Sequence, residues 1–165
     1  MLITLTGYMG CGKSTVGSLV ADALGCPFLD LDALIEKKAG KTIPQIFAAD
    51  GEESFRRLEK KLLEETVKKY AESTAVLALG GGTVTVPGAP VLLREKTLCI
   101  YLKASLETLQ DRLEGQTDGR PLAGEGFAER LERRLPLYEQ AARIILDTDG
   151  CKPEEIADEI IISCL

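Results

Sequence analysis

Nine residues near the start of the chain, Gly7 to Thr15, limit what this sequence can fold into more than any other stretch. They fit the pattern G-x-x-x-x-G-K-[ST], in which a glycine-rich loop wraps around phosphate groups. Glycines let successive backbone N–H groups turn inward toward phosphate oxygens. In this pattern Lys13 places a positive charge near the β- and γ-phosphates, and the Ser14 hydroxyl can ligate Mg²⁺. The motif therefore predicts a nucleotide site.

The flanking residues supply the strand and the helix that such a loop needs. Leu2 to Thr6 is a short β-prone run that ends at the loop, and apolar residues at helical spacing follow from Val16 to Leu24. A helix that begins here adds the positive end of its dipole to the anion site. The alternative, a glycine turn that merely contains Lys and Ser, does not account for these two neighbours.

Composition and charge narrow the class of protein. The chain has 165 residues, of which 45% are hydrophobic, and this suits a single domain with one core. Its formal net charge is −6, which argues against non-specific nucleic-acid binding because that needs a basic surface. The sequence contains no histidine, so imidazole can serve neither as a base nor as a metal ligand.

The cysteines and the apolar runs favour a cytoplasmic protein. Five cysteines, an odd number without the paired spacing of a zinc site, indicate a reducing compartment. The N-terminus enters a strand directly, without a basic and then apolar signal segment. No apolar run is long enough to cross a bilayer, so we expect no membrane partner. A monomer is the default expectation from the size of the chain.

The second strand is predicted to end in two carboxylates. Pro27 to Asp32 fits a short strand, and alternation would put Asp30 and Asp32 on the same side at its carboxyl end. In open α/β sheets ligands bind at that end. One carboxylate can help to hold Mg²⁺, and the other can meet a substrate hydroxyl. The alternative, capping of the helix that follows, explains one aspartate better than both.

The long helical segment that follows contains an arginine–glutamate pair. The helical pattern runs from Ala33 to Tyr70, and Gly40 and Gly51 interrupt it. Arg56 and Glu59 are three residues apart and share a helix face. A planar arginine fork is a natural partner of a substrate carboxylate. Spacing alone, however, favours a solvated ion pair on a surface helix.

A buried strand in the middle of the chain ends in three glycines. Val76 to Leu79 is a continuous apolar run, as in a central parallel strand, and Gly80, Gly81 and Gly82 follow it. These glycines would let the backbone approach a ligand closely, but a flexible turn explains them equally well. Many phosphate-loop proteins carry an aspartate after such a strand to place Mg²⁺. Glycine stands there in this chain, so Asp30 is the better candidate for that task.

A polar, glycine-rich stretch from Glu114 to Gly126 is predicted to be a lid. Arg112 precedes it and Arg120 lies within it. A long structureless loop inside a compact domain is often functional. An arginine carried on it could close onto the γ-phosphate and stabilise charge in the transition state. The alternative is a surface loop with a solvated arginine.

The remaining segments continue an alternation of strands and helices. We expect helices at 87–94, 106–113, 127–142 and 153–164, and strands at 98–102 and 144–147. Pro136 should kink or shorten its helix. This alternation predicts an α/β fold with a mostly parallel sheet that helices cover on both faces.

In its ordered set of motifs the chain resembles the shikimate kinases over nearly its whole length. The likeness rests on Gly7 to Gly17, Phe28 to Asp32 with Ile35-Glu36, Ile43 with Ile46-Phe47, Gly51-Glu52 with Phe55-Arg56 and Glu59, Gly80 to Gly82, Arg120-Pro121-Leu122, and Arg134 with Pro136-Leu137-Tyr138. The resemblance implies a P-loop NTPase fold with a five-stranded parallel sheet, arranged as in nucleoside monophosphate kinases. It implies one kinase domain, residues 1–165, with a core of 1–32, 71–111 and 141–165, a shikimate-binding helical segment at 33–61 and a lid at about 112–126.

The resemblance also implies transfer of the γ-phosphate of ATP to the 3-hydroxyl of shikimate, in the route to chorismate and aromatic amino acids. The implied shikimate-binding residues are Asp32, Arg56, Glu59, Gly80, Gly81, Gly82 and Arg134, with Arg56 and Arg134 on the carboxylate. The implied ATP-binding residues are Gly10, Cys11, Gly12, Lys13, Ser14, Thr15, Arg112, which stacks on adenine, and Arg120. The residues implied near Mg²⁺ are Ser14 and Asp30, and the implied catalytic residues are Lys13, Asp32 and Arg120.

Two departures and two other functions accompany the resemblance. The leucine run that usually follows the lid Arg-Pro is shortened to Leu122-Ala123, and Cys151-Lys152 stands where an arginine often lies near adenine. Another kinase of the same scaffold, for gluconate or a nucleoside monophosphate, is the first alternative, and the arginine pair argues for a carboxylate-bearing acceptor instead. A non-catalytic nucleotide-binding protein is the second, and the intact Lys13, Ser14, Asp32 and Arg120 argue against it.

Overall fold

Five parallel strands form one sheet in this computed structural model, which describes residues 1–114 and 126–164. The strands are β1 Leu2–Thr6, β2 Phe28–Asp30, β3 Ala75–Ala78, β4 Leu98–Lys103 and β5 Ile144–Asp147. They lie in the order β2-β3-β1-β4-β5, and every neighbouring pair is parallel. β1 and β3 are buried along their whole length, as expected for strands of a parallel sheet between helices. The predicted fold class is thus confirmed.

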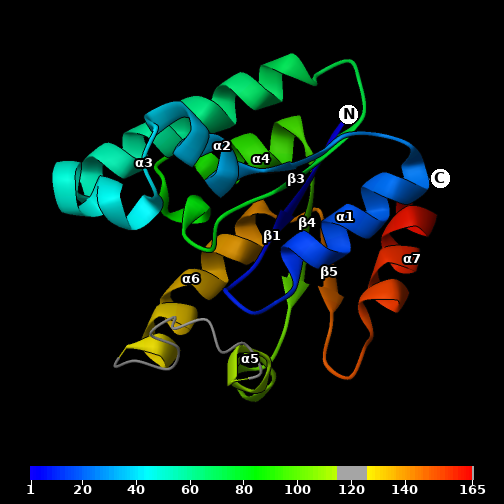
Figure 1. The fold of residues 1–165 in the computed structure, drawn as a ribbon. Coiled ribbons are helices and arrows are strands. Elements are labelled where there is room, and N and C mark those ends of the chain that lie inside the picture. The colour runs from blue at the N-terminus through cyan, green and yellow to red at the C-terminus, as the bar shows by residue number, and fades with distance from the viewer. Residues whose placement is uncertain (115–125, 165) are drawn as a thin grey trace.

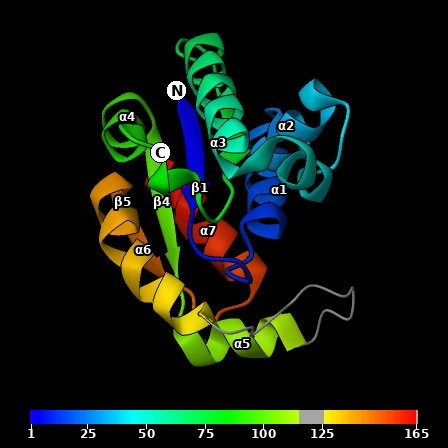
Figure 2. The same cartoon turned by 90° about the vertical axis from the view of Figure 1, so that its left-hand side faces the viewer.

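The described residues form seven α-helices, which cover both faces of the sheet (Figure 1). They are α1 Lys13–Leu24, α2 Leu31–Ala39, α3 Ile43–Lys69, α4 Ala89–Lys96, α5 Leu106–Glu114, α6 Phe127–Ala141 and α7 Pro153–Cys164, and a 3₁₀ helix, η1, spans Thr83–Thr85. Figure 2 shows α4 and α6 on one side of the sheet, and α1 and α7 on the other. α5 lies beyond the carboxyl ends of the strands in both views. None of these helices is long and apolar enough to cross a membrane.

Glycines set the position of α1, the helix that follows the phosphate loop. Gly12 precedes it with a φ of 91°, and Gly25 ends it with a φ of 66°. A Cβ on Gly17 would lie 2.7 Å from the Phe28 ring, so only glycine lets α1 rest directly on β2. The loop is therefore held between a central strand and a closely packed helix.

The helical pattern between residues 33 and 70 is interrupted at both predicted glycines. α2 ends at Gly40, which has a φ of 67°, and α3 begins after Thr42. Thr42 and Gln45 form a reciprocal capping box at that start. Gly51, with φ 83° and ψ 170°, divides α3 into two helical parts.

Pro136 lies inside its helix and does not shorten it, so of the two predicted effects only the kink stays a prediction. α6 continues past Pro136 to Ala141. Proline lacks the N–H that would bond to the carbonyl of Glu132, one turn back. Because both residues are exposed, water can satisfy that carbonyl and the helix continues.

Candidate active site

The loop between β1 and α1 has the conformation expected of a phosphate-binding loop. Gly7, Gly10 and Gly12 have positive φ angles, which other residues rarely adopt. A Cβ on Gly10 would lie 3.2 Å from the carbonyl oxygen of Leu109, so α5 packs tightly against the loop. The Lys13 ammonium donates to the Gly7 carbonyl at 2.7 Å, which holds its charge at the loop.

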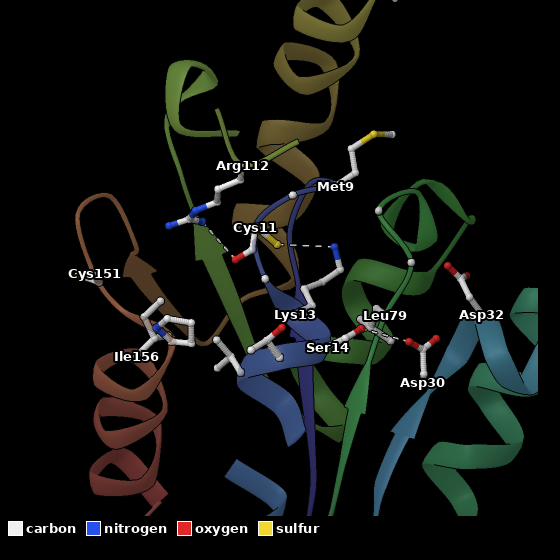
Figure 3. A pocket seen from close by; sticks show the side chains of 17 residues that line it. Met9, Cys11, Lys13, Ser14, Asp30, Asp32, Leu79, Arg112, Cys151 and Ile156 are labelled. Carbon is white, nitrogen blue, oxygen red and sulfur yellow. Dashed lines mark hydrogen bonds between the residues drawn. The ribbon is translucent and has the colours of Figure 1, made fainter. Parts of the chain in front are cut away.

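A cavity of about 540 Å³ opens at this loop (Figure 3). The predicted site residues that line it are Gly10, Cys11, Gly12, Lys13, Ser14, Thr15, Asp30, Asp32, Gly80, Gly81 and Arg112. In Figure 3, Arg112, Cys151 and Ile156 lie on one side of the loop. Asp30 and Asp32 lie on the other side. This agrees with the strand order, because Cys151 follows the edge strand β5 and Asp30 ends the opposite edge strand β2.

The structure corrects the predicted placement of the two carboxylates. β2 ends at Asp30, and Asp32 lies in the first turn of α2, so the two do not share one face of a strand. The cause is that α2 begins at Leu31, and Asp30 itself is the N-cap. Its Oδ1 accepts a hydrogen bond from the N–H of Ala33 at 3.2 Å, while its Oδ2 accepts one from the Ser14 hydroxyl at 3.2 Å. Asp30 therefore caps a helix and contacts the phosphate loop at once.

Ser14 and Asp30 suit a magnesium ion that takes only one or two ligands from the protein. Ser14 and Asp30 bring a hydroxyl and a carboxylate oxygen within 3.2 Å of each other at the cavity wall. Mg²⁺ prefers oxygen ligands, and usually one or two protein groups hold it together with water and substrate phosphates. Over residues 1–114 and 126–164, no group of three or more His, Cys, Asp or Glu side chains converges on a possible metal position.

Asp32 is a partly buried carboxylate at the cavity wall. Burial, and then the charges of Asp30 and Glu59, raise its pKa from an ordinary value of 3.8 to about 6, although Lys13 acts in the opposite direction. A Cβ on Gly80 would lie 2.9 Å from Asp32 Oδ1, so the carboxylate contacts the glycine loop. A carboxylate with such a pKa can accept a proton from a substrate hydroxyl at neutral pH.

The Arg56–Glu59 pair is not the solvated ion pair that its spacing favours. Arg56 Nη1 donates to Glu59 Oε1 at 2.8 Å, and the Glu59 side chain is only 1% exposed. The second oxygen of Glu59 accepts from the Thr83 hydroxyl at 2.8 Å, so both carboxylate oxygens have partners. A Cβ on Gly82 would lie 2.6 Å from Arg56 Nη2. The glycine therefore makes room for a guanidinium that the buried glutamate fixes.

Helix α6 supplies a second arginine to this region. Arg134 Cζ lies 5.7 Å from the centroid of the Tyr8 ring, within the range of a cation–π contact. One turn further along α6, the Tyr138 hydroxyl donates to the Gly81 carbonyl at 2.6 Å. A second cavity, of about 440 Å³, is lined by Glu52, Arg56, Thr85, Arg130, Arg133, Arg134 and Leu137. The two arginines that the sequence singled out thus meet in one cavity.

Three residues that hold this site together were not predicted as site residues: Tyr8, Thr83 and Tyr138. Each acts on a residue that is distant in the sequence, and 57 positions separate Tyr138 from Gly81. Spacing patterns cannot detect such contacts. The available signal was that Tyr8 and Tyr138 belong to stretches on which the resemblance rests, Gly7 to Gly17 and Pro136-Leu137-Tyr138.

The other end of the large cavity is built from α5 and the segment after β5. Arg112 donates to the Thr148 carbonyl at 2.9 Å and to the Cys11 carbonyl at 3.4 Å, so it ties α5 to the phosphate loop. Cys151 lines the cavity, whereas Lys152 is exposed and does not. A thiol thus stands at the end of the cavity where the resemblance implies adenine.

Two predictions fall outside the described residues. Arg120 and the shortened Leu122-Ala123 run both belong to residues 115–125. The lid, and the division of the chain into core, substrate-binding segment and lid, therefore stay predictions.

Comparison with known proteins agrees with this geometry. The family model described as shikimate kinase matches residues 9–165. A shikimate kinase of Synechococcus sp. is 49% identical over 163 residues, which cover 95% of this chain and 80% of that protein. One of Chlorobium chlorochromatii is 42% identical over 171 residues, with 96% and 88% covered. The solved structure of a shikimate kinase from Acinetobacter baumannii in complex with shikimate has a TM-score of 0.88 at 34% identity, and covers 99% of this chain and 92% of that one. This chain therefore belongs to the shikimate kinase family.

Proposed function

We propose that this chain transfers the γ-phosphate of ATP to the 3-hydroxyl of shikimate, which gives shikimate 3-phosphate and ADP. The observation that carries the proposal is that Arg56 and Arg134 line one cavity beside the glycine loop that borders the phosphate site. Two guanidinium groups from different helices suit the single carboxylate of shikimate. Membership in the shikimate kinase family, and the shikimate complex of a structural relative, support the same acceptor.

The nucleotide would lie along the phosphate loop. The N–H groups at the start of α1, together with Lys13, would bind the β- and γ-phosphates. Arg112 and Cys151 would border the adenine. Ser14 and Asp30 would hold Mg²⁺, which when bound offsets negative charge on the phosphate oxygens. Arg120, on the predicted lid at about 112–126, would reach the transferring phosphate.

The acceptor would lie between the glycine loop and the two arginines. Glu59 would keep Arg56 oriented toward the carboxylate of shikimate, and Gly80 to Gly82 would let the ring approach the backbone. Asp32 would hold the 3-hydroxyl and accept its proton late in the transfer, which its pKa of about 6 allows at neutral pH. In-line transfer then depends mainly on positioning and on charge stabilisation.

Release of ADP from ATP and Mg²⁺ tests this function, with shikimate, gluconate and AMP as parallel acceptors. We expect strong stimulation by shikimate alone, and we expect Asp32→Asn to remove most of it. Stimulation by gluconate or AMP instead would assign a different kinase activity. Binding of ATP without stimulation by any acceptor would indicate a nucleotide-binding protein without catalysis.

A cytoplasmic monomer is part of the same proposal. The described residues form one hydrophobic core, and all five cysteines are unpaired, as a reducing compartment would keep them. Sedimentation of the purified protein measures the oligomeric state directly.

A further inference from the structure

A third arginine lines the cavity that contains Arg56 and Arg134. We propose that Arg130 is a further binding residue for the carboxylate of the acceptor, and that Tyr8 of the phosphate loop positions it. This inference rests on the proposed function and extends its carboxylate site from two arginines to three.

Tyr8 is a rigid support for Arg130. Its hydroxyl donates to the Phe127 carbonyl at 2.9 Å and accepts from Arg130 Nε at 3.2 Å. The Tyr8 side chain is buried, and its ring lies against the Phe127 ring with centroids 4.9 Å apart. Phe127 and Arg130 both belong to the start of α6. The first turn of that helix therefore clamps a side chain of the phosphate loop.

This contact orients the guanidinium of Arg130. Because Nε bonds to Tyr8, the two terminal nitrogens are left for other partners, and the side chain lines the cavity of about 440 Å³. Paired terminal nitrogens in a plane match the two oxygens of a carboxylate. The guanidinium is therefore fixed through Nε, while its two terminal nitrogens stay available to a ligand in the cavity.

The charge of the cavity wall favours an anion. Four of its lining residues are arginines, and Glu52 is the single carboxylate among the described lining residues, which leaves a formal charge of +3. Glu59, which does not line the cavity, offsets part of this positive charge because its buried carboxylate pairs with Arg56. Arg130 and Arg134 have no ion pair with any described residue, so an incoming carboxylate would meet them uncompensated.

Arg133 provides a natural comparison in the same cavity. It belongs to the same helix as Arg130 and lines the same wall, but it is exposed and donates no hydrogen bond within the described part of the chain. Tyr8 allows a second comparison, because its ring also lies near Arg134. Tyr8→Phe keeps that ring and removes the hydroxyl, together with its hydrogen bonds to Arg130 and to the Phe127 carbonyl.

The test measures the affinity of the full-length protein for shikimate by titration calorimetry in the presence of ADP. Arg130→Gln should raise Kd about tenfold, as expected for one charge-assisted contact with a carboxylate at a partly exposed position. Tyr8→Phe should raise Kd about threefold, and the double variant should be no worse than Arg130→Gln, because the tyrosine acts through the arginine. Arg133→Gln, with the same change of charge, should alter Kd by less than about twofold.

A shikimate analogue with a carboxamide in place of the carboxylate distinguishes the loss of a contact with the carboxylate from a general disturbance of the folded structure. The wild type and Arg130→Gln should bind it equally, and their affinities for ATP should match. Equal losses in Arg130→Gln and Arg133→Gln would overturn the proposal, since they would indicate net charge alone. A loss that persists with the carboxamide would also overturn it. A wild type that binds ATP but not shikimate would instead refute the proposed acceptor.

Discussion

The charged carboxylate of Asp32 should make the folded protein less stable at neutral pH than an uncharged side chain at this position would, although the proposed reaction uses that carboxylate. Its pKa is about 6 in the folded protein against an ordinary value of 3.8, because burial and three nearby carboxylates disfavour the charged form. At 1.36 kcal/mol per pKa unit, that difference corresponds to about 3 kcal/mol of unfolding free energy. Since the side chain is partly exposed, solvent screening makes this an upper figure.

The direction of this pH effect depends on whether the folded or the unfolded chain binds the proton of Asp32 more tightly. A carboxyl group whose pKa is raised by folding binds its proton better in the folded chain than in the unfolded chain. Its contribution to stability is therefore fully present below a pH of about 4 and is lost as the pH rises through about 6. Asp32→Asn has no charge to lose over that range. Relative to the wild type, the variant should gain up to about 3 kcal/mol between about pH 4 and about pH 8, while it loses most of its activity.

Urea denaturation of both proteins over that pH range measures the difference in unfolding free energy. Asp158→Asn, which removes an exposed carboxylate on α7, serves as the matched control for the loss of one charge. The activity of the wild type should fall on the acidic side with an apparent midpoint near the pKa of about 6. A stability difference between Asp32→Asn and the wild type that does not grow with pH would refute this reasoning.

Three further substitutions or modifications test the site. Glu59→Gln should lower the unfolding free energy by about 2 kcal/mol in urea denaturation, because it removes the buried charged partner of Arg56 and leaves only the exposed Glu52 at 3.7 Å, and unchanged stability would contradict this. Gly82→Ala should weaken shikimate binding about tenfold or more at constant ATP affinity, since its Cβ would lie 2.6 Å from Arg56 Nη2. An unchanged affinity of Gly82→Ala for shikimate would refute the steric argument. Alkylation of Cys151, followed by mass spectrometry, should be slowed by ATP but not by shikimate. Equal alkylation rates with and without ATP would mean that bound nucleotide does not cover Cys151.

Most of the fold could be predicted because the strands of a parallel sheet are apolar and end at residues that break the pattern. β1 and β3 are examples, since each is followed closely by glycine. The start of α2 was misplaced because Leu31 is apolar and fits both an alternating strand and a buried helix face. That shift moved the capping role to Asp30 and put Asp32 on a helix.

The candidate site was predictable where one segment contains it and not where distant segments meet. The phosphate loop is contiguous, so its residues and their chemistry follow from the pattern alone. Spacing showed that Arg56 and Glu59 share a helix face, but not that Thr83 would cover the glutamate. The resemblance, rather than the spacing, placed that pair in the site. Likewise, nothing in the local sequence of Tyr8 indicates that the start of α6 will clamp it.

The strand order has a consequence for synthesis of the chain on the ribosome. β1 and β2 are made first, yet they do not pair with each other, and every strand pair among the described residues includes β3 or β4. The nascent chain therefore cannot begin its sheet until Ala75–Ala78 has left the exit tunnel, and until then the apolar β1 has no partner strand. Unpaired apolar strands of this kind are prone to aggregate. The phosphate loop, which follows β1, thus depends for its shape on strands that are translated after it.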